Sequence, residues 1–255
     1  MLRSFAALAL VAGCRAGFDP VTRDRDSIDA GSVPLPIDAP TQPATPALLM
    51  WLPMDDGIAD GMANDASGNN NNAWCVDGAC PREVPGHNGL ALAGFSSLAP
   101  GIELADAPHW RLATFSLTAW VKLMNPGSYA AIVSKPLGGG TANSFQLQIR
   151  NTGDLSCVIS DGVGEARVTS TTSIPLDAWT HTACTYDGAQ LRLYVMGQQV
   201  ATPVAGIPLA YDEQSVFIGA DRNAGQLAAA FDGHIDDVRI YAESLAPETI
   251  ATLAE

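Results

Sequence analysis

The sequence has few basic residues. Its 255 residues include 13 Lys and Arg against 27 Asp and Glu, which gives a formal net charge of -14 at pH 7. A protein that binds nucleic acid needs a basic surface to neutralise phosphates, so this balance argues against nucleic acid as a partner. It argues equally against electrostatic docking on an anionic lipid surface, where Lys and Arg supply the attraction.

Most motifs of common enzyme classes are also missing. The sequence has no H-E-x-x-H zinc helix, no G-x-S-x-G nucleophile turn and no glycine-rich phosphate loop. Retaining glycosidases use two carboxylates roughly 5 Å apart. The E-x-D-x-x-E pattern that places such carboxylates on one strand is absent, and Glu103, Glu165 and Glu213 stand alone. We therefore expect a non-catalytic protein, with a hydrolase that has an unrecognised carboxylate pair as the alternative.

The hydrophobic run at the start of the chain is short. It covers residues 5–12, after the basic Arg3, and a membrane-spanning helix needs about 20 residues. Such a run is typical of a secretory signal. It ends in Val-Ala-Gly-Cys at 11–14, which resembles the lipobox of bacterial lipoproteins, so residues 1–14 are predicted to be a signal peptide with a lipid-bearing Cys14. An ordinary signal peptide with a chance cysteine is the alternative. By the same resemblance, Arg15 in place of Asp favours the outer membrane and a lipid anchor as the only membrane contact.

Residues 15–46 are rich in proline and aspartate. Six Pro and five Asp occur there, with hardly any aromatic residue and no apolar periodicity. Such a segment cannot bury enough surface to offset its chain entropy. We predict a disordered tether, which proline bias extends at about 3 Å per residue.

Residues 47–255 carry the signals of a single all-β domain. Along 115–122, Phe, Leu, Ala and Val alternate with Ser, Thr, Trp and Lys, which is the period of a half-buried strand. Domains of this class often reach 200 residues. The expected elements are strands at 115–122, 145–150, 155–159, 179–186 and 191–196, and a short helix at 246–253.

Four cysteines remain after Cys14. An even number in an exported chain indicates disulfides. We pair Cys75 with Cys80, which closes a short loop, and Cys157 with Cys184, because their strands are expected to be neighbours in one sheet. Other pairings stay open.

Five motifs occur in an order that resembles the LamG-like jelly-roll family, the laminin-G branch of the concanavalin A-like sandwiches. They are Trp-Leu-Pro-Met-Asp-Asp-Gly at 51–57, Ser-Gly-Asn-Asn-Asn at 67–71, Phe-Ser-Leu-Thr-Ala-Trp-Val at 115–121, Trp-Thr-His-Thr-Ala-Cys-Thr-Tyr-Asp-Gly at 179–188, and the ending at 215–220 and 231–241. The resemblance implies an all-β, two-sheet antiparallel jelly-roll sandwich with one short C-terminal helix. It implies a glycan or a protein as ligand, without choosing between them.

Family members often carry one structural calcium ion that joins the two ends of the domain. Calcium prefers six to eight hard oxygen ligands. The candidate ligands are Asp55, Asp56, Asp65, Asn69, Asn71, Asp236 and Asp237. Two alternatives stay open: Asp and Asn also stabilise turns without metal, and Asp237 has Arg239 nearby as an ion-pair partner.

Exposed aromatic rings are the usual stacking surfaces for sugars. The candidates in loop-like stretches are Trp74, Trp110, Tyr129 and Tyr211. The tryptophans inside strand motifs, Trp51, Trp120 and Trp179, are expected to pack in the core. Loops carry specificity in such folds, and the candidate loops are 69–85, 125–129, 137–143 and 221–226.

Together these observations predict an exported lipoprotein of the cell envelope whose LamG-like domain binds a glycan or protein without catalysis. A purely structural envelope protein is a further alternative.

Overall fold

A computed structural model describes residues 47–58, 60–96 and 98–255. All described residues belong to one compact unit, Thr45–Glu255. The predicted signal peptide, Cys14 and the tether at 15–46 lie outside the described residues. In the part of the chain that the structure describes, no helix has both the length and the apolar character needed to span a membrane.

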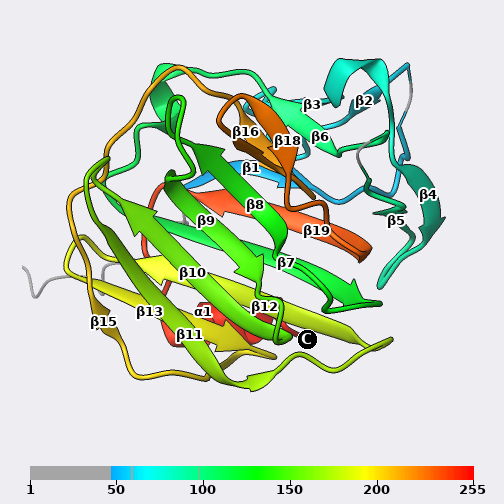
Figure 1. Ribbon diagram of the computed structural model, residues 1–255. Coiled ribbons are helices and arrows are strands. Elements are labelled where there is room, and N and C mark those ends of the chain that lie inside the picture. The colour runs from blue at the N-terminus through cyan, green and yellow to red at the C-terminus, as the bar shows by residue number, and fades with distance from the viewer. Residues whose placement is uncertain (1–46, 59, 97) are drawn as a thin grey trace, which may run out of the picture. The chain divides into compact units, whose positions relative to one another are not determined.

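Two antiparallel sheets form this unit (Figure 1). The larger sheet has nine strands, in the order β14-β13-β12-β7-β19-β5-β4, with β1 paired to β19 and β15 paired to β13. Its strands are β1 (Leu48–Leu52), β4 (Arg82–Pro85), β5 (Leu90–Ala93), β7 (Phe115–Leu123), β12 (Trp179–Tyr186), β13 (Gln190–Val195), β14 (Gln198–Gln199), β15 (Val204–Ala205) and β19 (Gly233–Tyr241).

The second sheet has eight strands, in the order β11-β10-β9-β8-β16-β6-β3-β2. They are β2 (Met62–Ala63), β3 (Ala73–Cys75), β6 (Ile102–Leu104), β8 (Ala130–Pro136), β9 (Asn143–Ile149), β10 (Asp154–Ser160), β11 (Glu165–Ser173) and β16 (Val216–Ile218). The remaining elements are the hairpin of β17 (Asp221–Asn223) and β18 (Gln226–Ala228), the 3₁₀ turns η1 (Val76–Gly78) and η2 (Pro108–Trp110), and the helix α1 (Pro247–Leu253).

Alternation along the strands places the core between the sheets. On β7, Phe115, Leu117 and Val121 are fully buried in the main apolar cluster. The intervening residues point to the outer face of the nine-stranded sheet, where α1 covers part of it through Ile250. The predicted two-sheet sandwich with one short C-terminal helix is therefore confirmed.

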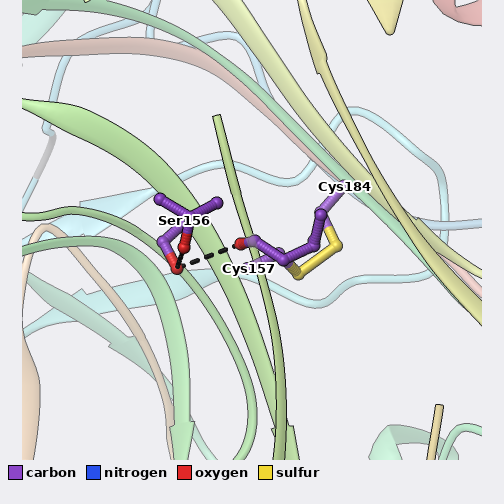
Figure 2. The surroundings of a disulfide bond; sticks show 5 residues. Ser156, Cys157 and Cys184 are labelled. Atoms are coloured by element: carbon purple, nitrogen blue, oxygen red, sulfur yellow. Dashed lines mark hydrogen bonds between the residues drawn. A yellow bond between two sulfur atoms is a disulfide. The ribbon is translucent and has the colours of Figure 1, made fainter. Parts of the chain in front are cut away.

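Both predicted disulfides are present, but the reason given for one of them is wrong. Cys75 is bonded to Cys80, and Cys157 to Cys184 with their Cα atoms 6.2 Å apart. Cys157 lies on β10 and Cys184 on β12, so the two strands belong to opposite sheets. Figure 2 shows the bridge beside Ser156, whose hydroxyl donates a hydrogen bond to Val168 O on β11. Period-two alternation turns both cysteines inward, and they meet across the core.

Strand β19 contains a bulge that matters for the acidic residues at its centre. Asp236 pairs with Trp120 and Arg239 with Thr118, so two residues of β19 oppose one residue of β7. Asp237 takes the left-handed backbone conformation there, with φ of 48°. A bulge of this kind redirects side chains.

Candidate ligand-binding site

The outer face of the eight-stranded sheet carries a row of polar side chains. On β9, Phe145 and Leu147 enter the core, and Gln146 and Gln148 therefore lie on the opposite face. Gln146 pairs with Ser134 on β8 and with Val158 on β10. The amides of Gln146 and Gln148 are therefore neighbours on the outer face of β9.

The β17–β18 hairpin follows β16 and is fastened to this face through Asp221. Asp221 Oδ2 accepts hydrogen bonds from Asn143 Nδ2 at 3.1 Å and Gln146 Nε2 at 3.0 Å. Its Oδ1 accepts one from the backbone N–H of Arg222 at 2.8 Å. The hairpin lies beside β8, where β18 is labelled in Figure 1. A carboxylate with three donors in a buried place is an anchor for the amides around it.

Burial dominates the electrostatics of Asp221. It raises the pKa of this carboxyl above its usual value, and the hydrogen bonds from Asn143, Arg222 and Gln146 offset the rise only in part. The amide donors favour the charged form. The arrangement suits a carboxylate that holds other side chains in place.

A cavity of about 380 Å³ opens above the amide row. It is lined by Tyr129, Thr141, Asn143, Gln146, Gln148, Val158, Glu165, Arg167, Asp221, Asn223 and Ala229. These residues come from β9, β10, β11, the hairpin and the segments before β8 and β9. The hairpin also meets the loop before β9, where the N–H of Ala224 donates to Gly140 O at 2.7 Å.

Two acceptors that line this cavity lack partners. Asn143 is only 4% exposed, and its Oδ1 is buried without a hydrogen bond. Asn223 Oδ1 is likewise buried and unpartnered. Buried polar groups in native proteins almost always have a partner, so unpaired acceptors at a cavity indicate where a ligand or water donates.

Charged groups at the cavity are largely paired. Arg167 Nη2 lies 3.1 Å from Glu165 Oε2, and both side chains are exposed on β11. Because the charges of this ion pair cancel, the carboxylate of Asp221 is the remaining charge among the described residues that line the cavity. Amides, a tyrosine ring and one carboxylate are groups that bind hydroxyl-rich molecules.

One of the four aromatic residues proposed from the sequence lines this cavity. Tyr129 is that residue, and it is 44% exposed. Trp74 is 52% exposed on β3 opposite Glu103, on the same sheet but outside the cavity.

The prediction is wrong for Trp110 and Tyr211. Trp110 is 1% exposed and its Nε1 donates to Ala105 O at 3.2 Å. Tyr211 packs against the core and its hydroxyl donates to Leu112 O at 2.8 Å. Their rings serve packing because η2 and the segment before β16 fold over the edge of the core.

Two of the three tryptophans in the strand motifs, Trp51 and Trp120, do not pack in the core between the sheets. Trp120 lies on the outer face of the nine-stranded sheet, covered by His87 at 3.5 Å between ring centroids. Trp51 is half-buried, donates through Nε1 to Asp237, and lies under the guanidinium of Arg239. The expectation of core packing is wrong for these two because each occupies an outward position of its strand.

The candidate calcium ligands fall into two groups. In the first, Asp65 accepts hydrogen bonds from the backbone N–H groups of Trp51, Ser67 and Asn71. The side-chain amides of Asn69 and Asn71 donate to carbonyl oxygens of β1. Asp65 fits a calcium site poorly, since both of its carboxylate oxygens already accept hydrogen bonds, and the amide nitrogens of Asn69 and Asn71 hold the turn at 65–71 against β1.

The second group lies at another cavity, of about 590 Å³, on the outer face of the nine-stranded sheet. Asp55, Asp236 and Asp237 line it, whereas Asp56 is an exposed turn residue. Asp236 is 1% exposed; its Oδ2 accepts the N–H of His87 at 2.8 Å, and its Oδ1 is buried without a partner.

Asp55 and Asp236 fit a cation better than the other candidates. A Cβ on Gly89 would clash with Asp55, and one on Gly86 would clash with Asp236. The loop at 86–89 therefore passes close to both carboxylates. Asp237 is instead paired with Arg239 at 3.0 Å, as the ion-pair alternative expected. Among residues 47–58, 60–96 and 98–255, no three His, Cys, Asp or Glu side chains converge on one metal position, so calcium stays a prediction.

Sequence reasoning missed the residues at the centre of the polar cavity. Gln146 and Gln148 were not among the candidates. The loops 125–129, 137–143 and 221–226 were, and all three contribute to the cavity, the last two through Asn143 and Asp221. The alternation of Gln146 and Gln148 with apolar residues was the available signal for an outward amide row.

Comparisons with known proteins agree with the fold. The model of the concanavalin A-like lectin/glucanases superfamily matches residues 96–251, which is more than half of the chain. The chain belongs to this superfamily. No curated protein matches the chain.

Several solved structures share this concanavalin A-like fold. Domain 4 of AbnA, a GH43 extracellular arabinanase from Geobacillus stearothermophilus, in complex with arabinotriose, is 19% identical, with a TM-score of 0.65 over 82% of this chain and 99% of that one. The binding domain of botulinum neurotoxin DC, in complex with SialylT, is 14% identical, with a TM-score of 0.59 over 82% of this chain and 50% of that one. The CBM40 of the Ruminococcus gnavus IT-sialidase, bound to alpha2,3 sialyllactose, is 15% identical, with a TM-score of 0.50 over 56% of this chain and 84% of that one.

Proposed function

We propose that this concanavalin A-like domain is a non-catalytic glycan-binding module of an exported, surface-anchored lipoprotein, and that it binds its ligand in the polar cavity of the eight-stranded sheet. The observation that carries the proposal is the pair of buried, unpartnered acceptors, Asn143 Oδ1 and Asn223 Oδ1, beside fixed amides. Sugars offer hydroxyl donors at the spacing of neighbouring amides, and the ring of Tyr129 offers a face for stacking.

The structural neighbours support the glycan class. The AbnA domain is described in complex with arabinotriose, and the CBM40 with sialyllactose. Two disulfides support export, since disulfides persist in oxidising compartments. The Val-Ala-Gly-Cys sequence at 11–14 supports attachment through a lipid on Cys14.

A glycan array tests the function. The array is probed with full-length proteins that all carry Cys14→Ser, which removes the proposed lipid site. One has the wild-type cavity, one carries Tyr129→Ala and one carries Gln148→Ala. We expect the wild-type cavity to retain specific oligosaccharides and both variants to lose at least about 10-fold in affinity, equivalent to 1.4 kcal/mol. Trp74→Ala is the matched control, because this exposed aromatic residue lies on the same sheet outside the cavity. Equal binding by all four proteins, or binding lost only with Trp74→Ala, would place the ligand elsewhere.

A hydrolase is the second candidate, because Asp221 and Glu165 line the same cavity. The hydrogen bonds to Asp221 from three donors and the ion pair of Glu165 with Arg167 argue against an acid and base pair. Oligosaccharides retained on the array are incubated with the protein and checked for new reducing ends. We expect none; release that disappears in Glu165→Gln would establish the hydrolase instead.

A further inference from the structure

We infer that the polar cavity selects neutral sugars and discriminates against glycans that carry carboxylates, such as sialic or uronic acids. This inference rests on the proposed glycan-binding function and adds the charge class of the ligand. Acceptor oxygens in the cavity require hydroxyl donors, and a free cation for a carboxylate is missing among the described lining residues.

The orientation of the Asn143 amide is fixed by its partner. Its Nδ2 faces Asp221 Oδ2 at 3.1 Å, and a carboxylate accepts only from the NH₂ side of an amide. Asn143 Oδ1 is therefore the atom left over, and it is buried without a donor. A ligand that satisfies it has to bring an O–H or N–H group.

The surroundings add further acceptors of the same kind. Asn223 Oδ1 is a second buried acceptor without a partner, and Asp221 itself is an acceptor at the base of the hairpin. A carboxylate brought next to these oxygens would be desolvated and would meet a like charge. Sugar hydroxyls donate to such oxygens without this cost.

The basic residue that lines the cavity is in an ion pair. Arg167, the one cation among the lining residues that the structure describes, pairs with Glu165 at 3.1 Å. Arg222 follows Asp221 but does not line the cavity: its guanidinium lies 5.3 Å from the centre of the Phe217 ring, and its Nε is buried without a hydrogen-bond partner. Recognition of an acidic sugar normally uses an available Arg fork, and neither guanidinium is arranged as one.

Matched pairs of neutral and acidic oligosaccharides test the inference. Affinities of the full chain with Cys14→Ser are measured for lactose against 3′-sialyllactose and for galactotriose against trigalacturonate, together with the strongest neutral and acidic glycans of the array. We expect each neutral glycan to bind at least about 10-fold more tightly than its acidic counterpart. Their affinity is expected to change by less than about 2-fold between 50 and 500 mM salt, since no charge pair is formed.

The variant Glu165→Gln sharpens the comparison because it releases Arg167. It is expected to strengthen binding of the acidic glycan relative to that of the neutral glycan. Acidic glycans that bind as tightly as neutral ones, and that lose binding in Tyr129→Ala and Gln148→Ala, overturn the inference while the proposed function stands. Absence of binding for both classes overturns the proposed function and the inference with it.

Discussion

Gln146 and Asp221 are 75 residues apart in the sequence, and their side chains are joined by a hydrogen bond of 3.0 Å. The bond connects the centre of β9 with the first residue of the β17–β18 hairpin. The shape of the polar cavity therefore depends on a contact between a strand of the sheet and a hairpin folded onto it.

Removal of the Asp221 carboxylate is expected to loosen this hairpin. Asp221→Ala leaves the buried amides of Asn143 and Gln146 without their acceptor, at a cost of about 1–3 kcal/mol or more in the free energy of unfolding. Urea denaturation measures the change, and the control is Asp232→Ala, whose side chain is exposed and whose effect is expected to stay within about 0.5 kcal/mol. Equal stability of the two variants would contradict the anchoring role.

The two disulfides are expected to contribute unequally. Cys157–Cys184 spans 27 residues of sequence and Cys75–Cys80 spans 5, so the chain-entropy model gives about 3.5 and about 2 kcal/mol respectively. Denaturation of the two double Cys→Ala variants measures both values. Mass mapping of a non-reduced digest is the first check, and any cross-pairing between the two sets would contradict the structure.

The alternating strands were predictable because burial of one face imposes a period of two. The pairing of Cys157 with Cys184 was predicted from an expected neighbourhood in one sheet, because the turn and strand signals could not tell a neighbour in one sheet from a partner across the core. The amide row was missed because Gln146 and Gln148 become a site only when the hairpin that starts at Asp221 folds over them. That contact depends on tertiary packing, and local sequence carries no signal for it.

Calcium is expected to act at Asp55 and Asp236 and not at the turn around Asp65. A ligand at about 100 times its Kd that binds only the native state adds about 2.7 kcal/mol to the free energy of unfolding. Thermal melts in EDTA and in excess calcium measure this shift, which Asp236→Asn should abolish. Asp65→Asn should lower the Tm in both conditions and keep the shift. Coincident melts of the wild type would show that calcium does not bind.

Acid is expected to destabilise the domain through His181. Burial, followed by the nearby Arg239 and His87, lowers the pKa of His181 from 6.5 to about 4. Between these values the unfolded chain binds the proton and the folded chain does not. Stability is therefore fully present above about pH 6.5 and falls as the pH drops toward 4, by on the order of 3 kcal/mol.

An NMR titration of the His181 ring measures its pKa directly. The difference in unfolding free energy between the wild type and His181→Gln should shrink by a comparable amount over the same range. A ring that titrates near 6.5 in the folded protein would contradict this account.

Lipid attachment is expected at Cys14, which lies outside the described residues. Metabolic labelling with a palmitate analogue should mark the wild type and not Cys14→Ser, because the proposed acyl chains require this thiol. Equal labelling of both proteins, or recovery of the wild type free in the medium, would contradict the anchor.

The position of the Cys157–Cys184 bridge also determines how the domain carries mechanical load. The described chain enters through β1 in the nine-stranded sheet, and the polar cavity proposed to bind the ligand lies on the other sheet. A pull between a bound ligand and the amino-terminal side of the domain has to pass from one sheet to the other. Strand β10 lies next to β9 and is covalently joined to β12, so part of that force passes through the sulfur–sulfur bond. This bond resists sliding of the two sheets at forces that would separate a contact made by apolar packing alone.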